Sequence, residues 1–219
     1  MAPAVRVYLA GEVCLEADDR LLPEPLLPGP LGRHLLAFLV AEHTRPVGHD
    51  ELVDELWQDS PPRAWAVSLK ALASRIRASL TAAGFDGPRL LVGAPGLYRF
   101  RLPDRGWVDL DAARAAAHEA ETLLARGDPD GALAAAFVTR LITARPLLPG
   151  RTGPWLEHCR RVLSELRLRA LECSARAHVM RGTPGRAVRD AQLALRDALG
   201  VGPSPVTRER HSALLAQAG

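Results

Sequence analysis

A cluster of basic and hydroxyl side chains follows one face of the segment at residues 60–83. Its apolar residues recur every three or four positions, which puts them on one side of a helix that can rest on a core: Leu69, Leu72, Ile76 and Leu80. The opposite side carries a polar set: Arg63, Lys70, Ser74 and, toward its edge, Arg77. Because Arg and Lys reach phosphates and guanine edges, such a helix can enter the major groove of DNA. A solvent-exposed amphipathic helix fits the same pattern.

Both ends of this segment carry helix signals. Ser60 can cap a helix, and Pro61 and Pro62 can occupy its first positions, where no intrahelical N–H is needed. Gly84 can end the helix. We therefore expect one helix through residues 60–83.

Charge is divided unevenly along the chain. Residues 1–60 contain four Arg and eleven Asp or Glu, a net charge of −7. Residues 61–105 contain seven Arg, Lys70 and two Asp, a net charge of +6. Positive charge begins where the expected helix begins, which favours a polyanion as the partner of this segment.

Composition limits the class of protein. The 219-residue chain is long enough for two domains, and 47% hydrophobic residues argue against disorder. No apolar run approaches the roughly 18 residues of a membrane span, and no secretory signal is visible, so we expect a cytoplasmic protein. Cys14, Cys159 and Cys173 are widely spaced, which suggests reduced thiols. His158 and His178 near two of them lack zinc-finger spacing, and we expect no metal and no cofactor.

Strands and one helix are expected before the basic segment. Residues 5–15 alternate between apolar and polar side chains, as in short antiparallel strands. The proline-rich residues 21–30 predict an edge strand or a connection. Residues 31–43 are apolar enough for a buried helix, which Pro46 prevents from continuing.

Residues 49–57 predict a second, compact helix. Its inward side chains are Leu52, Val53 and Leu56. Its acids are expected to face solvent, where those near the N-terminus suit the helix dipole: Asp50, Glu51, Asp54 and Glu55. The short break before the basic segment gives the spacing of a helix-turn-helix.

A hairpin is expected after Gly84. Two strand-like runs, at residues 90–92 and 97–102, are joined by a glycine- and proline-containing turn. Arg99 and Arg101 share one face of the second run, where each can contact phosphate or simply face solvent. Strands, three helices and a hairpin make a winged helix-turn-helix domain, which we assign to residues 1–105.

The remaining residues, 106–219, are helical in pattern. The expected helices are 108–126, 131–144, 155–180, 186–199 and 205–217. Helix pairs of this length suggest a tetratricopeptide-like array. The predicted fold class is therefore α+β and mostly helical, with the winged helix followed by an all-α domain.

The first domain resembles a known family. The runs RPVGHDELVDELWQDSPP, SLKALASRIRASL and GLYRF resemble the OmpR/PhoB-type winged helix of the actinobacterial antibiotic regulatory proteins. The resemblance covers about residues 5–103 and implies that residues 60–83 read DNA and that residues 90–102 form the wing. Lys70, Ser74, Arg75 and Arg77 match polar or basic positions of the family pattern.

The expected reading helix also departs from that family. Ala71-Leu72-Ala73 stands where the family commonly has Thr-Tyr-Val, and Ala78 stands at a basic position. Losing a hydroxyl and a guanidinium would weaken or relax base reading.

The second domain is similar to the bacterial transcriptional activation domain of the same family, on the runs WLEHCRRVLSELRLRALE and ALGVGPSPVTRERHSALL. About one helical hairpin of that domain is missing between Met180 and Thr183. A stacked array without one repeat loses burial between neighbours, so a partner can be needed to complete it.

The resemblance implies a transcription regulator that activates promoters of secondary-metabolite genes by recruiting RNA polymerase or a sigma factor. Its expected partners are double-stranded promoter DNA and a second copy of the chain. The DNA-contacting residues are expected to be Arg63, Lys70, Ser74, Arg75, Arg77, Arg99 and Arg101. The alternative is a regulator-derived module that binds another protein and has weak or lost DNA binding.

Enzyme signatures are not apparent in the sequence. The glycines at 93 and 96 lie between strand-like runs and do not open a helix, unlike a dinucleotide loop. The histidines are scattered and are expected at the surface or at boundaries: His34, His43, His49, His118 and His211. The tryptophans are expected to be packing anchors: Trp57, Trp65, Trp107 and Trp155. We therefore expect no enzyme.

Overall fold

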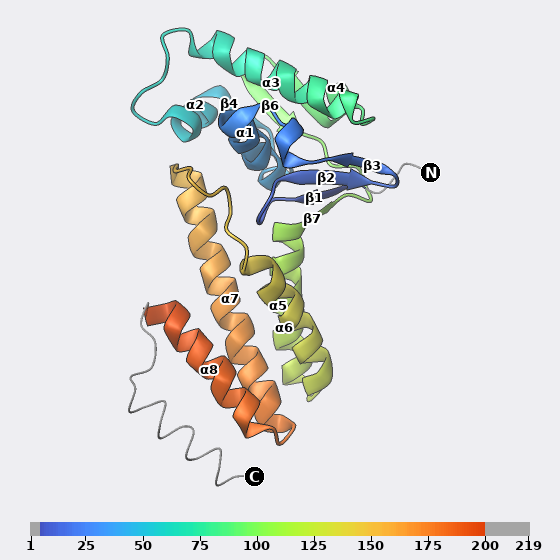
Figure 1. The fold of residues 1–219 in the computed structure, drawn as a ribbon, viewed down its shortest axis with the longest axis vertical. Helices are drawn as coiled ribbons and strands as arrows, with labels where there is room; N and C mark the ends of the chain where they lie inside the picture. Colours follow the sequence, from blue (N-terminus) through green and yellow to red (C-terminus); the bar gives the residue numbers. More distant parts are fainter. Residues whose placement is uncertain (1–4, 200–219) are drawn as a thin grey trace. The chain divides into compact units, whose positions relative to one another are not determined.

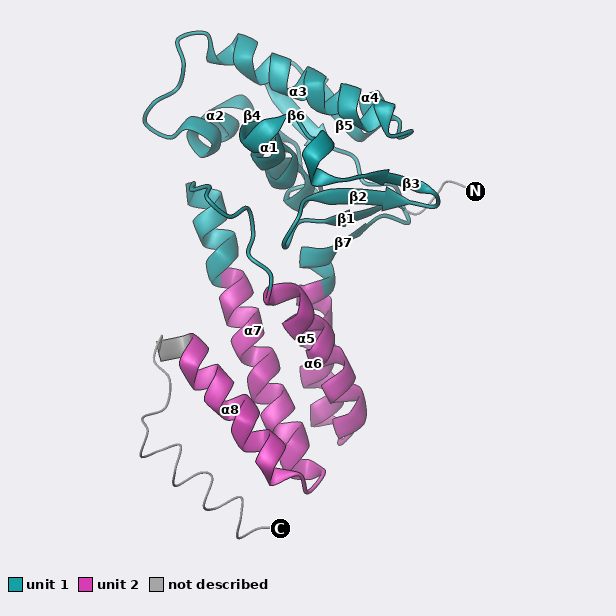
Figure 2. Cartoon of the chain, in the orientation of Figure 1, with its two compact units in different colours: residues 1–112, 145–161 teal, residues 113–144, 162–219 magenta. Residues whose placement is uncertain are grey.

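The computed structural model describes residues 5–199 (Figure 1). The chain divides into two compact units, one of residues 1–112 and 145–161 and the other of residues 113–144 and 162–219 (Figure 2). The expected helix at 205–217 and His211 lie outside the described residues. No helix within the described part combines the length and apolarity needed to cross a membrane.

Unit 1 begins with a four-stranded sheet in the order β3-β2-β1-β7. Its strands are β1 (Arg6–Tyr8), β2 (Cys14–Ala17), β3 (Arg20–Leu22) and β7 (Trp107–Val108). The first three are antiparallel, and β7 adds in parallel beside β1. The expected strands at 5–15 and the edge strand at the start of 21–30 are confirmed.

Unit 1 also contains a second, three-stranded sheet in the order β4-β6-β5, and the strands of this sheet lie between helices along the chain. The helices are α1 (Gly29–Ala41), α2 (His49–Trp57), α3 (Trp65–Ala82) and the single turn α4 (Gly87–Leu90), with the 3₁₀ turn η1 (Glu24–Leu26) before α1. The strands are β4 (Val47–Gly48), β5 (Leu91–Ala94) and β6 (Leu97–Phe100). The two helices and the hairpin are confirmed, and α2 has the expected bounds, but the expected short break was wrong because residues 58–64 separate α2 from α3.

The core of unit 1 is mostly aliphatic. Phe100 is fully buried, and so are leucines of α1, α2 and α3, including Leu36, Leu52 and Leu69. Figure 1 shows α3 along one edge of this unit, and α1 packs against it. The apolar stripe of α3 is thus used for packing, which leaves its other side to solvent.

Glu55 is the exception to the expected outward acids of α2. This residue is 2% exposed, and its carboxylate accepts backbone N–H groups of Trp155 and Leu156 at 2.8 and 3.3 Å. Those residues belong to the first turn of α7 (Pro154–Met180), where N–H groups have no partner within the helix. The prediction that Glu55 faces solvent was wrong, because the N-terminus of α7, about 100 residues later in the chain, supplies the hydrogen-bond donors that water would otherwise supply.

His34 extends this buried contact. Its Nε2 lies 2.7 Å from Glu55 Oε1, and its Nδ1 accepts a hydrogen bond from Arg151 Nε at 3.3 Å. Because Nδ1 is an acceptor, the proton of a neutral ring is on Nε2 and is donated to Glu55. His34 is 0% exposed, so its expected surface position was wrong.

The connection before α7 is also part of unit 1. Leu147 and Leu148 are buried, and the guanidinium of Arg160 donates hydrogen bonds to both of their carbonyls at 2.8 Å. Gly153 lies directly against Glu55, and a Cβ at this position would overlap the carboxylate. The sequence signalled only a break between helices here, whereas the structure has an ordered connection.

Unit 2 is a packed helical array of α5 (Asp109–Ala125), α6 (Pro129–Thr143), α7 and α8 (Pro184–Leu199), of which residues 109–112 and 154–161 belong to unit 1. Its core is made of small side chains: Ala120, Ala132, Ala135, Ala136, Ala170, Cys173 and Ala177. Small residues let helix backbones approach closely. The α+β, mostly helical fold class is confirmed.

Helix ends and ion pairs organise unit 2. The carboxylate of Asp128 caps α6 by accepting the N–H of Gly131 at 2.9 Å. Arg169 donates two hydrogen bonds of 2.7 Å to Glu121, which lowers the pKa of that carboxyl. Residues 181–183 alone connect α7 to α8, which agrees with the short connection seen in the sequence.

Replacing Glu55 with Ala is expected to lower the free energy of unfolding by about 3 kcal/mol, because it leaves buried donors without an acceptor. Glu55→Gln keeps an acceptor and should lose less. Asp54→Ala, which removes an exposed acid of the same helix, should change the free energy by under about 0.5 kcal/mol. Urea unfolding followed by circular dichroism measures all three; equal effects of Glu55→Ala and Asp54→Ala would contradict the capping role.

Asp109 gives the chain a pH-dependent stability. Its buried carboxylate accepts the N–H groups of Leu9 and Ala10 at 2.9 Å, and burial raises its pKa. The folded state then binds a proton more tightly than the unfolded state, so this group stabilises the fold at low pH and less as pH rises through the raised pKa. In Asp109→Asn, unfolding midpoints should improve relative to the parent as the pH rises above about 4, the ordinary pKa of an aspartate. A difference that stays constant as the pH rises would refute this account.

Candidate nucleic-acid interface

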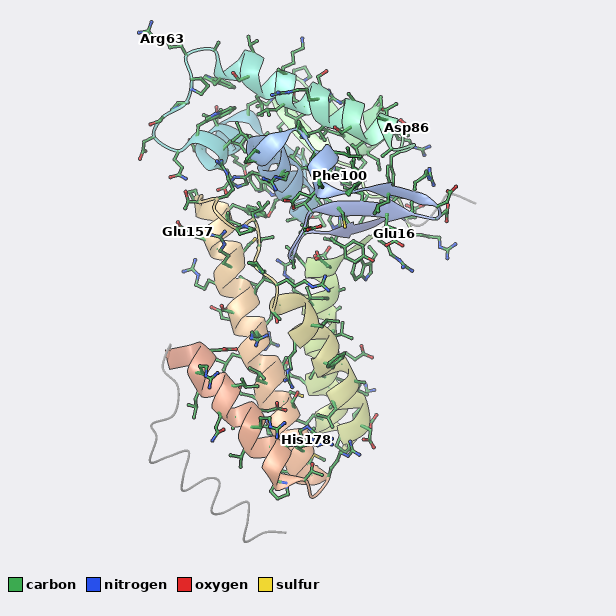
Figure 3. The ribbon with its side chains drawn as sticks, viewed as in Figure 1. Glu16, Arg63, Asp86, Phe100, Glu157 and His178 are labelled. Atoms are coloured by element: carbon green, nitrogen blue, oxygen red, sulfur yellow. The ribbon has the colours of Figure 1, made fainter. Side chains whose placement is uncertain are left out.

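The helix α3 begins later than the sequence suggested. Its first residue is Trp65, its N-cap is Ala64, and Ser60 makes no cap, so the expected start at residue 60 was wrong. Pro61 precedes another proline, which disfavours helical backbone there and delays the helix. Arg63 therefore lies on the exposed loop before α3, where Figure 3 shows its side chain extended from the chain.

Three of the expected contact residues share the solvent side of α3. Lys70, Ser74 and Arg75 are all exposed, while Leu69, Leu72, Ala73, Ile76 and Leu80 are buried beneath them. A helix fixed by five buried side chains presents its outer side rigidly. This side has two cations and one hydroxyl within two turns, which is a chemistry suited to phosphate and base contacts.

Arg77 has a different position from these three. Its Nε donates a hydrogen bond of 2.7 Å to the carbonyl of Leu91, and its guanidinium lies 5.8 Å from the ring centroid of Tyr98. Both partners belong to the β5–β6 hairpin. Arg77 therefore ties α3 to the hairpin, with its guanidinium partly buried.

Arg99 and Arg101 also differ from each other. Arg99 donates to the carbonyls of His43 and Thr44 at 3.3 and 3.2 Å, so it joins β6 to the end of the α1 segment. Arg101 follows the strand and is exposed. Among the described residues, Arg99 thus uses its guanidinium to hold the strand in place, whereas the side chain of Arg101 faces solvent.

The hairpin has the form of a wing. Pro95 and Gly96 form its tip, with Gly96 at φ +75°, a conformation that glycine adopts without strain. Tyr98 is 7% exposed, whereas Leu97 on the opposite face is 38% exposed. Packed and outward side chains thus alternate along β6.

An aromatic contact that was not predicted from the sequence joins the wing to both helices of the helix-turn-helix. The ring of His49 stacks on Tyr98 with 5.2 Å between centroids and meets Trp65 edge-on at 6.1 Å. The N–H of His49 donates to the carbonyl of Gly96 at 3.0 Å. The pairing of Val47 with Tyr98 places these rings together, and no sequence periodicity signals a contact between strands so far apart.

The acids of α2 are partly neutralised. Arg45 donates two hydrogen bonds to Glu51, at 3.1 and 2.8 Å, and a third to Glu42 at 2.8 Å. The guanidinium lowers the pKa of Glu51. Pairing reduces the repulsion that this acidic helix would exert on a polyanion near α3.

The described residues hold no group of three or more His, Cys, Asp or Glu that could bind a metal ion. His158, Cys159, Cys173 and His178 are thus not gathered into such a group. The fold and the exposed cations define a winged helix-turn-helix protein.

Comparisons with known proteins identify the group of regulators to which this protein is related. Transcriptional regulatory protein EmbR of Mycobacterium tuberculosis is 40% identical over 96 residues, which cover 44% of this chain and 24% of EmbR. Transcriptional regulatory protein MoaR1 of the same species is 32% identical over 126 residues, 58% of this chain and 40% of MoaR1. Regulatory protein AfsR of Streptomyces coelicolor is 32% identical over 170 residues, 77% of this chain and 16% of AfsR. No protein-family model matches the chain.

The chain is homologous to these actinobacterial antibiotic regulatory proteins over its N-terminal region, which confirms the resemblance found in its sequence. It spans only about a quarter of the length of EmbR. The relatives are regulatory proteins and not enzymes, in agreement with the expectation for this chain. The fold also matches a solved structure of M. tuberculosis EmbR in complex with a low affinity phosphopeptide, with a TM-score of 0.64 and 23% identity over 99% of this chain and 66% of that one.

Arg77→Gln is expected to loosen the wing, because it removes the charged donor to Leu91 and the contact with Tyr98. The free energy of unfolding should fall by about 1 kcal/mol, and amide hydrogens of β5 should exchange faster. Arg75→Gln, an exposed residue of the same helix, is the matched control and should leave β5 unchanged. Equal exchange in both variants would show that Arg77 does not hold the wing.

Proposed function

We propose that this protein is a DNA-binding transcription regulator in which α3 lies in the major groove. Residues 1–105 are the DNA-binding domain, and residues 106–219 correspond to the bacterial transcriptional activation domain. The observation that carries this proposal is the solvent side of α3, where Lys70, Ser74 and Arg75 are exposed above a buried stripe. The homology to transcriptional regulators supports it.

The seven expected contacts then take different roles. Arg63, Lys70, Ser74 and Arg75 contact DNA from α3 and its preceding loop. Arg101 contacts the phosphate backbone from the wing. Arg77 and Arg99 combine their protein hydrogen bonds with backbone contacts through the remaining guanidinium N–H groups, since an arginine has five donors.

The finer function follows from the family. We propose that the chain acts in the cytoplasm as an activator, recruiting RNA polymerase or a sigma factor to promoters of secondary-metabolite genes. Its helical domain mediates dimerisation or contacts the transcription machinery. Regulatory protein AfsR, which aligns with 77% of the chain, supports the regulatory role on which this finer proposal builds.

One observation favours the alternative of a protein-interaction module. Large apolar side chains are exposed on α6, α7 and α8: Phe137 at 62%, Leu141 at 51%, Val179 at 65%, Met180 at 52% and Leu195 at 59%. Exposed apolar clusters commonly mark protein contacts. Size-exclusion chromatography with and without DNA separates the two functions, because a DNA-indifferent chain that co-elutes with a protein partner would support only the second.

Charge reversal on α3 tests the DNA-binding role. DNA fragments are first selected from a random pool by the purified protein, and their affinity is then measured in gel shifts across a salt series. Lys70→Glu and Arg75→Glu should each weaken binding and reduce the salt slope by about one.

The control is Arg189→Glu, which makes the same charge change at an exposed position of α8. It should leave the affinity and the slope close to those of the parent. Unchanged binding by all three variants would contradict the assignment of α3. Circular dichroism spectra should be the same for all proteins, since every substituted side chain is exposed.

A further inference from the structure

The outermost strip of α3 has little capacity for hydrogen bonding. Since successive residues turn by about 100°, the positions farthest from the buried stripe are Val67, Ala71, Ser74 and Ala78. All four are exposed, and Val67 is 70% exposed. Ser74 is the single hydrogen-bonding side chain of this strip, and Lys70 and Arg75 lie on its two flanks.

Position on the helix decides which part of DNA a side chain can touch. When a helix lies in the major groove, residues on the centre of its outward side meet base edges, whereas long flanking cations reach the phosphates. Val67 and Ala71 are therefore positioned for bases, and Lys70 and Arg75 for the backbone. A single exposed valine is ordinary on a protein surface, but here it occupies the centre of the reading side.

The chemistry of these two side chains selects one base. Guanine, cytosine and adenine present hydrogen-bonding groups in the major groove, and an aliphatic side chain cannot satisfy them. Thymine also presents its C5-methyl group, which makes favourable apolar contact with Ala or Val. Burying a polar edge against Val67 costs free energy, while burying a methyl group lowers it.

We propose that Val67 and Ala71 contact the C5-methyl groups of thymines, so that the bound DNA site is specified by thymine methyls at the centre of the reading helix. This inference rests on the proposed function, and it adds that the bound DNA must contain thymine where Val67 and Ala71 meet the bases. The two residues are one helical turn apart, about 6 Å along the axis. Their thymines therefore lie within about two base steps of each other, at about 3.4 Å per step.

Deoxyuridine substitution tests the inference, because deoxyuridine differs from thymidine only by the missing methyl group. Each thymine of a DNA site selected by the purified protein is replaced in turn, and affinity is measured by fluorescence anisotropy. At least two replacements, within two base steps, should each weaken binding about four-fold, the equivalent of one buried methyl group.

Val67→Ala identifies the side chain that makes the contact. The variant should bind the selected DNA more weakly and should be insensitive to deoxyuridine at one of the two sensitive thymines, while the other thymine remains sensitive. Val179→Ala makes the same change at a valine of α7 that is 65% exposed and should leave the whole deoxyuridine profile unchanged.

The outcomes separate this inference from the proposed function. Tight binding that is indifferent to deoxyuridine at every thymine, or a profile that Val67→Ala does not alter, would overturn the methyl contact and leave DNA binding established. Failure to select any DNA would overturn the proposed function and the inference together. Sensitivity at one thymine that disappears only in Val67→Ala, with a second sensitive thymine nearby, would establish it.

Discussion

The buried carboxylate of Glu55 is the contact on which unit 1 most depends. It joins α2 to His34 of α1 and to the first turn of α7, residues that are 100 positions away along the chain. A carboxylate removed from water is stable only where donors replace the lost solvent. The N-terminal N–H groups of α7 and the Nε2 of His34 supply those donors. The buried charge therefore fixes where α7 begins against the helix-turn-helix.

A second set of contacts fixes the reading side of the winged helix. Five buried side chains hold α3 on the core, Arg77 ties it to β5, and the stack of His49 on Tyr98 connects the wing to α2. These contacts use the inward side and one edge of α3. The opposite side is exposed, so under the proposed function its residues can vary with the DNA sequence without disturbing these contacts.

Much of this organisation could be predicted from local patterns. The spacing of Leu69, Leu72, Ile76 and Leu80 identified the buried stripe of α3, and the alternation around Tyr98 identified the wing, because both signals lie within a few residues. Glu55 was misjudged, since its neighbours on α2 are solvated acids and its donors lie in α7. The start of α3 was predicted too early, because Ser60 is a typical N-cap residue but the two prolines after it delay the helix to Trp65. Contacts between residues far apart in the chain leave no periodic pattern in the sequence, so the contacts of Glu55 with α7 could be found only in the structure.

The discontinuous composition of unit 1 has a consequence for how the protein is made. Residues 145–161 complete this unit, yet residues 113–144 of unit 2 intervene in the sequence. During synthesis the N-terminal segment emerges first, and Glu55 cannot meet its backbone donors until Trp155 and Leu156 have left the ribosome. The first unit therefore reaches its final state only after residues 113–144 of the second have been translated, which differs from the usual order in which an N-terminal domain finishes before the next begins.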